Sequence, residues 1–136
     1  MPHAKALTWK AFMKGSPTSY VQGYRRRLTE WRRLGAVTRT EPTRTERARA
    51  LGYKRKQGFA VVRVRIRKGH PFKQRPRAGR RPKRMGILKI TYAISDKKIA
   101  ENRAQKKYRN MRLLGSYLAG EDGQYKWFEV VFAPQL

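Results

Sequence analysis

Residues 124–132 read QYKWFEVVF, and this stretch decides the fold. Its apolar side chains fall on both faces of an extended strand: Tyr125, Trp127 and Val131 on one, and Phe128, Val130 and Phe132 on the other. A strand that is apolar on both faces lies inside a sheet that is covered on both sides. The stretch therefore predicts a layered domain with this strand in its interior.

The preceding residues supply further elements of the same domain. Gly120-Glu121-Asp122-Gly123 predicts a hairpin that joins a strand at 112–119 to the last strand. Ser95 and Asp96 are typical of a helix start, and the apolar period from 99 to 111 continues that helix. Residues 59–66 and 87–94 alternate apolar and polar with a period of two, which predicts two more strands.

The N-terminal part is more helical. Residues 4–13 can form a short helix, and residues 18–34 a longer one that ends before Gly35. Residues 43–46 fit a capping box, in which Thr43 and Glu46 bond reciprocally, and a short helix to Leu51 would follow. We therefore predict a basic helical arm over 1–58 and a core domain over 59–136, which contains a long basic loop at 67–86.

Charge limits the possible partners. The 136 residues hold 35 Lys and Arg against 8 Asp and Glu, for a formal net charge of +27. The 49 residues from 47 to 95 hold no carboxylate, whereas 96–136 is nearly balanced. Such an excess requires a polyanion, either nucleic acid or an anionic membrane surface.

Several classes of protein are not expected. The chain has no cysteine, which excludes disulfides, thiol catalysis and cysteine-ligated zinc. It has no apolar run that could cross a membrane, and its start lacks the apolar core of a secretory signal, so we expect a cytoplasmic protein. Its two histidines, His3 and His70, have no partner at ligand or catalytic spacing. We therefore expect no enzyme activity, no cofactor and no metal.

Two segments of the core are candidates for polyanion contact. Arg63, Arg65 and Arg67 place three guanidinium groups along one strand face, at intervals of about 6.6–6.8 Å. A solvated face is the alternative, but such faces ordinarily mix charges of both signs. The loop 67–86 holds nine Lys and Arg and three prolines, and we expect it to order only between phosphates.

A third candidate is the segment 52–58, which reads GYKRKQG. Its aromatic side chain, Tyr53, precedes a basic triplet between two glycines, and such a ring can stack on an unpaired base. Packing beneath the loop explains Tyr53 equally well, and the sequence does not decide between the two.

Several short motifs, taken in order, resemble the L15e family of large-subunit ribosomal proteins, in its archaeal rather than its eukaryotic branch. The motifs are Pro42-Thr43-Arg44, Leu51-Gly52-Tyr53-Lys54, Lys56-Gln57-Gly58, Val64-Arg65-Ile66-Arg67-Lys68-Gly69, Ala78-Gly79-Arg80-Arg81-Pro82-Lys83-Arg84, Leu114-Gly115-Ser116-Tyr117, Gly120-Glu121-Asp122-Gly123 and Lys126-Trp127-Phe128-Glu129-Val130. The resemblance covers about 25–132. Family members continue past the last strand with an Asp-Pro motif and a long extension, whereas this sequence stops at Leu136, so contacts of such an extension are not predicted here.

The resemblance implies an α+β fold: a four-stranded antiparallel sheet with helices on both faces, a helical N-terminal arm and a long basic loop. It also implies a structural role in the cytoplasmic ribosome, bound to large-subunit ribosomal RNA and beside neighbouring ribosomal proteins, with no membrane and no homo-oligomer. The residues expected to face RNA are Arg44, Arg47, Tyr53, Lys54, Arg55, Lys56, Arg63, Arg65, Arg67, Lys68, Lys73, Arg75, Arg77, Arg80, Arg81, Lys83 and Arg84.

Two other classes remain as alternatives. A DNA-binding or chromatin-like basic protein would show helix-turn-helix spacing or a dimer seam, and we find neither. A membrane-surface protein would need a helix with a wide apolar face, whereas 18–34 has a narrow aromatic stripe beside Arg25, Arg26 and Arg27.

Overall fold

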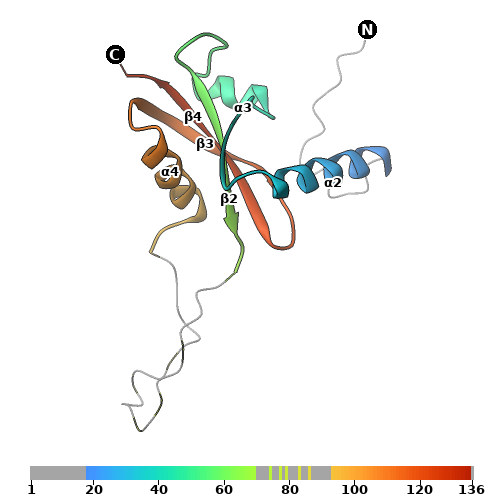
Figure 1. Ribbon diagram of the computed structural model, residues 1–136, viewed down its shortest axis with the longest axis vertical. Helices are drawn as coiled ribbons and strands as arrows, with labels where there is room; N and C mark the ends of the chain where they lie inside the picture. Colours follow the sequence, from blue (N-terminus) through green and yellow to red (C-terminus); the bar gives the residue numbers. More distant parts are fainter. Residues whose placement is uncertain are drawn as a thin grey trace. The chain divides into compact units, whose positions relative to one another are not determined.

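The computed structural model describes residues 18–69, 74, 77, 79, 83, 86 and 93–135. The chain divides into two compact units between Gly35 and Ala36 (Figure 1). The described part of the first unit is one helix, α2 (Thr18–Arg33). The predicted helix at 4–13 lies outside the described residues.

Helix α2 confirms the predicted helix at 18–34 and ends one residue earlier than expected. Arg32 and Arg33 occupy its last turn, where positive charge interacts favourably with the helix dipole. Leu28 and Trp31 of the predicted apolar stripe are buried, whereas Leu34, just past the helix end, is exposed.

The second unit is built on a four-stranded antiparallel sheet with the order β1-β2-β4-β3. Its strands are β1 (Val37–Thr40), β2 (Ala60–Arg67), β3 (Met111–Glu121) and β4 (Tyr125–Pro134). Strand β4, which has apolar side chains on both faces, pairs with β2 at the centre of the sheet, where both faces are covered. The predicted interior position of 124–132 is therefore confirmed.

Strand β1 was not expected. It contains only four residues, and its partner is β2, with Val37 opposite Val64 and Thr40 opposite Val61. The predicted strand at 87–94 falls mostly outside the described residues. Its last two residues, Ala93 and Ile94, lie in a bend and are exposed, because the chain turns there toward the next helix.

Helices cover both faces of the sheet, as predicted (Figure 1). Helix α4 (Asp96–Lys107) buries Ala100 and Ala104 on the face that presents Val62, Val64, Phe128, Val130 and Phe132. Ser95 caps α4 by accepting a hydrogen bond from the Lys98 backbone N–H at 3.4 Å, as expected. The opposite face carries α3 (Thr45–Ala50), whose Ala48 packs with Val61, Tyr117 and Val131.

The hairpin between β3 and β4 is also confirmed. The Asp122 carboxylate accepts hydrogen bonds from the backbone N–H groups of Gln124 and Tyr125 at 2.7 and 2.6 Å, which closes the turn. Strand β3 has a register shift at Leu113 and Gly115. A Cβ at Gly115 would lie 3.0 Å from the Leu51 side chain, so the missing side chain lets the end of α3 approach the sheet.

Part of the predicted arm belongs to the sheet unit. Residues 36–58 carry β1, which is hydrogen-bonded to β2, and α3, which covers one face. The boundary predicted at Gly58 therefore falls inside the second unit, which extends from Ala36 to Leu136. This placement fixes the basic segment 44–56 to the same scaffold as the strands.

Candidate nucleic-acid interface

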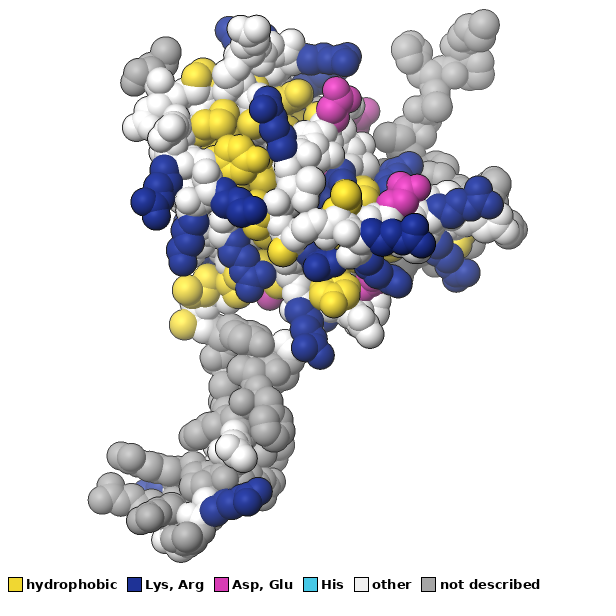
Figure 2. Space-filling model, viewed as in Figure 1, with side chains coloured by type: hydrophobic (Ala, Val, Ile, Leu, Met, Phe, Trp, Pro, Cys, Tyr) yellow, Lys and Arg dark blue, Asp and Glu magenta, His cyan; other side chains and the backbone are white. Residues whose placement is uncertain are grey.

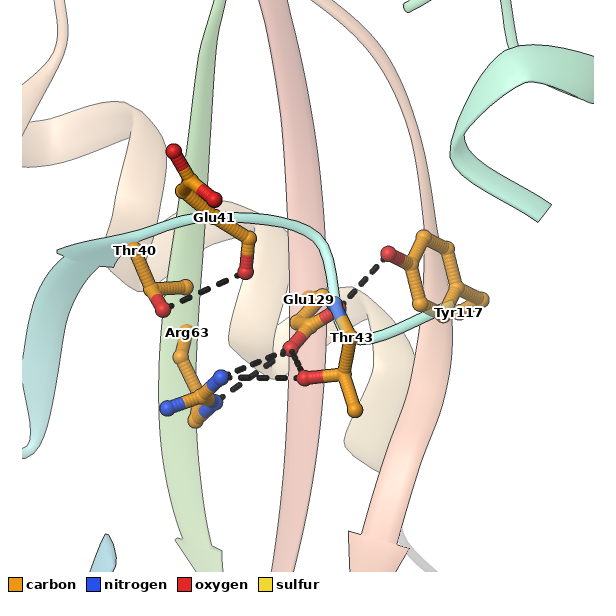
Figure 3. A network of polar contacts seen from close by, with 6 residues as sticks. All are labelled: Thr40, Glu41, Thr43, Arg63, Tyr117 and Glu129. Carbon is orange, nitrogen blue, oxygen red and sulfur yellow. Dashed lines mark hydrogen bonds and ion pairs between the residues drawn. The ribbon is translucent and has the colours of Figure 1, made fainter. Parts of the chain in front are cut away.

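A buried carboxylate organises the face of the sheet that α3 covers. Glu129, in central strand β4, has no exposed surface and accepts five hydrogen bonds (Figure 3). Arg63 donates from Nη2 at 3.0 Å and from Nε at 3.3 Å, and the Tyr117 hydroxyl donates at 2.6 Å. Thr43 donates from its backbone N–H at 2.9 Å and from its hydroxyl at 2.5 Å. We call these four residues the Glu129 network.

The sheet register explains the network. Arg63, Glu129 and Tyr117 are cross-strand neighbours on β2, β4 and β3, so their side chains meet on one face. An isolated buried carboxylate would be very costly, and the cation and hydroxyl partners remove that cost. Burial, and then the negative charge of Glu129, raise the pKa of Tyr117 above its ordinary value, so this hydroxyl stays a donor.

The network ties the start of the basic segment to the sheet. Thr43 lies just before α3 and is 86 residues from Glu129 in sequence. Its hydroxyl also accepts a hydrogen bond from Arg63 at 3.1 Å. The segment that leads into α3 is therefore held by two strands of the sheet, which fixes the start of the backbone from which the following cations extend.

The predicted capping box is wrong. The residue at the N-cap of α3 is Arg44, and no side chain caps the helix. The Thr43 hydroxyl donates to Glu129 instead, because a charged, buried acceptor forms a stronger hydrogen bond than a backbone group at an exposed helix end. Glu46 is exposed in the first turn of α3.

The predicted row of three arginines on an open strand face is wrong for Arg63. Arg63 is only 8% exposed, because its guanidinium pairs with Glu129 beneath the segment that precedes α3. Further along β2 the cover ends: Arg65 is half-buried, with its guanidinium 4.9 Å from the centre of the Tyr125 ring, and Arg67 is exposed. Of the three, Arg65 and Arg67 keep the accessibility that a phosphate contact needs.

The remaining predicted residues divide by exposure. Arg44 and Lys68 are half-buried, and Lys68 pairs with Glu121 at 3.2 Å. The exposed ones are Arg47, Lys54, Arg55, Lys56, Arg77 and Lys83. The predictions for Lys73, Arg75, Arg80, Arg81 and Arg84, and the expected ordering of the loop on RNA, lie outside the described residues.

Tyr53 packs against the protein. It borders the cluster of Ala48, Val61, Tyr117 and Val131, and its ring lies edge-on to Phe59 with 6.2 Å between ring centres. Tyr53 is half-buried and lines a pocket with Glu41, Pro42, Thr45, Arg49, Lys54 and Arg55. Packing, one of the two alternatives, is therefore confirmed, and base stacking stays a prediction.

The acidic residues of the second half of the chain are used inside the fold. Asp96 binds Lys126 at 2.6 Å, and Glu101 accepts from the Ser116 hydroxyl at 2.7 Å. Glu121, Asp122 and Glu129 form the contacts described above. These carboxylates stabilise the fold and leave most cations elsewhere uncompensated. Figure 2 shows one face of the molecule, on which Lys and Arg side chains are spread and Asp and Glu side chains are few.

In the described part of the chain, aspartates and glutamates form no group of three or more that could hold a metal ion. None of its helices is long and apolar enough to cross a membrane. The exposed cations of the segment 44–56 and of the end of β2 are thus its most prominent chemical feature.

The signal for the Glu129 network was present in the sequence but was missed. Glu129 is a lone carboxylate within the apolar run of the last strand, and a buried acid in a central strand requires a cation opposite it. Arg63 is the arginine of β2 that the register places there. The register was not known from the sequence, so this arginine could not be separated from its two neighbours.

Comparisons with known proteins agree on one family. The family model described as Ribosomal L15 matches residues 8–135. The large ribosomal subunit protein eL15 of Metallosphaera sedula is 55% identical over 108 residues, which are 79% of this chain and 50% of that protein. The protein of the same name from Natronomonas pharaonis is 56% identical over 106 residues, 77% of this chain and 54% of that protein. The chain thus spans about half the length of these relatives.

Proposed function

Since the chain belongs to the Ribosomal L15 family, in its L15e form, we propose that it is a structural constituent of the large ribosomal subunit that binds and stabilises ribosomal RNA. Its place is the cytoplasmic ribosome, beside neighbouring ribosomal proteins, and it acts without catalysis. The archaeal relatives, which are named as large-subunit proteins, support this proposal.

The observation that carries the proposal is that the acidic side chains bond within the fold while the basic side chains remain in large excess. The carboxylates of 96–136 bond within the fold, whereas the net charge of the chain is +27. Backbone phosphates are the partner that such a surface requires, because each contact releases condensed counterions.

We infer that two described regions face RNA. The first is the segment 44–56, with Arg44, Arg47, Lys54, Arg55 and Lys56, held by the Glu129 network. The second is the end of β2, with Arg65, Arg67 and Lys68, from which the chain enters the basic loop 67–86. We assign Arg63 a role in stabilising the fold, because its guanidinium pairs with the Glu129 carboxylate.

Co-sedimentation tests the function. Tagged protein expressed in an archaeal host should sediment with the large subunit and stay there through a high-salt wash, since many phosphate contacts and close packing resist exchange. Sedimentation with chromosomal DNA, or release of all the protein as free monomer or dimer at moderate salt, would contradict the proposal and favour the DNA-binding alternative.

A further inference from the structure

The pocket beside α3 has a mixed chemistry that phosphate binding alone does not explain. It is a hollow of about 400 Å³, within the ~300–1,000 Å³ range of small-ligand sites. Its lining combines an aromatic residue, Tyr53, with Pro42, Thr45, three cations (Arg49, Lys54 and Arg55) and one carboxylate, Glu41. A surface that bound only phosphate would gain nothing from a carboxylate.

The fold holds the apolar walls of this pocket. Pro42 precedes Thr43, which the Glu129 network anchors by two hydrogen bonds. The Tyr53 backbone N–H donates to the Ala48 carbonyl at 3.0 Å, and Phe59 supports the ring edge. The pocket is thus preorganised, which lowers the entropy that a ligand must overcome.

The polar groups, by contrast, are free to turn toward a ligand. The side chains of Glu41 and Arg55 are 84% and 88% exposed, and their closest approach is 3.8 Å, so their pairing is weak. The Glu41 carboxylate points away from the Glu129 network (Figure 3). It is therefore an acceptor available at the pocket, next to cations that can take a phosphate.

We propose that this pocket binds one unpaired guanine nucleotide of RNA, an inference that rests on the proposed function. The base stacks on the accessible part of the Tyr53 ring, its phosphates lie against Arg49, Lys54 and Arg55, and Glu41 reads its Watson–Crick edge.

Guanine fits because of its donors. An ionised carboxylate has two oxygens and only accepts hydrogen bonds. Guanine offers two adjacent donors, N1–H and the N2 amino group, on one edge. Adenine and cytosine each place a ring-nitrogen acceptor beside a single amino group, and uracil flanks its one N–H with two carbonyl oxygens. Only guanine therefore matches both oxygens of Glu41 without a repulsive contact.

The test measures base preference separately from overall RNA binding. Labelled 20-nucleotide single strands are titrated with the 136-residue chain and followed by fluorescence anisotropy. One strand is oligo(U), and three others carry guanine, adenine or cytosine at every fourth position. We expect the guanine strand to bind roughly tenfold more tightly than the other three, which corresponds to about 1.4 kcal/mol.

Three variants connect the preference to the pocket. Glu41→Gln should reduce the guanine preference to below about twofold, without weakening oligo(U) binding, because the amide keeps only one acceptor oxygen. Tyr53→Leu keeps an apolar side chain at the cluster and should weaken all four strands by loss of stacking. Arg109→Gln, which removes one exposed cation outside the pocket, should leave the guanine preference unchanged.

The outcomes separate the two proposals. Equal binding of all four strands by the unmodified protein, or a guanine preference that survives Glu41→Gln, would overturn the guanine site while leaving RNA binding intact. Failure to bind oligo(U) and ribosomal RNA even at low salt would overturn the proposed function itself. Because Glu41 is exposed, Glu41→Gln should fold normally, and a thermal unfolding curve verifies this.

Discussion

Replacing Glu129 by Gln should destabilise the sheet unit more than any surface change. The two carboxylate oxygens divide their donors unequally. Oε1 accepts from the Thr43 hydroxyl and from both Arg63 nitrogens, and Oε2 accepts from the Thr43 backbone N–H and the Tyr117 hydroxyl. Whichever oxygen becomes an amide NH₂ then faces a group that can only donate, either the Arg63 guanidinium or the Thr43 backbone N–H, and the buried Arg63 loses the negative charge of Glu129.

The expected loss follows from that geometry. At least one hydrogen bond disappears and the others lose their charged acceptor. A loss equal to about two bonds to a charged group, at roughly 1.5–3 kcal/mol each, is about 3–6 kcal/mol. Removal of one partner from a buried ion pair costs about 3–5 kcal/mol in other proteins, which agrees. Since small domains are stable by only about 5–15 kcal/mol, the variant should lose a large part of its stability.

Urea unfolding measures this change. The transition can be followed by tryptophan fluorescence, because Trp127 is 1% exposed in the folded state and becomes hydrated on unfolding. The matched control is Glu46→Gln, the same chemical change at an exposed position of α3, which should alter the free energy of unfolding by less than about 0.5 kcal/mol. A Glu129→Gln loss below about 1 kcal/mol would refute the reasoning.

The double variant Arg63→Gln with Glu129→Gln sharpens the test. If the missing negative charge beside the buried Arg63 guanidinium causes much of the loss, removal of that guanidinium as well should restore part of the stability, and the two changes should not be additive. Strictly additive losses would show that Arg63 and Glu129 stabilise the fold independently of each other.

Three further outcomes are expected. The variant Tyr117→Phe should be less stable than the unmodified protein at neutral pH. This difference in the free energy of unfolding should shrink as the pH rises above about 10, because the raised pKa of Tyr117 means that its hydroxyl ionises at a lower pH in the unfolded state than in the folded state. A difference that is constant up to about pH 11 would contradict this. Arg67→Gln should weaken ribosomal RNA binding and leave the urea midpoint unchanged, whereas Arg63→Gln should lower the midpoint; the reverse pattern would mean that the two roles are exchanged. For about 10 phosphate contacts, the logarithm of RNA affinity should fall against the logarithm of salt concentration with a slope of roughly −7 to −9, and a slope near zero in a salt titration would exclude binding dominated by phosphate.

Much of the fold could be predicted because its signals are local. The apolar alternation of 59–66, the two apolar faces of 124–132, the Asp122 turn and the Ser95 cap depend on neighbouring residues, and each is found where expected. Strand β1 could not be predicted, because its four residues have too short a pattern and gain their stability from pairing with β2. The capping box failed for the opposite reason: a local pattern was overridden by a partner 86 residues away.

The sequence by itself determined the requirement for a polyanion, the central strands and the family, since charge excess, alternation and motif order are properties of the chain. Only the tertiary structure decided which cations remain free. Arg63, Arg65 and Arg67 have the same spacing and the same face, yet Arg63 lies opposite Glu129 under the chain that leads into α3, while Arg67 lies beyond that cover. The period of a strand assigns a side chain to a face of the sheet. The register, together with the layer packed on that face, decides whether the charge of the side chain is neutralised inside the protein or exposed at the surface, where RNA can bind it.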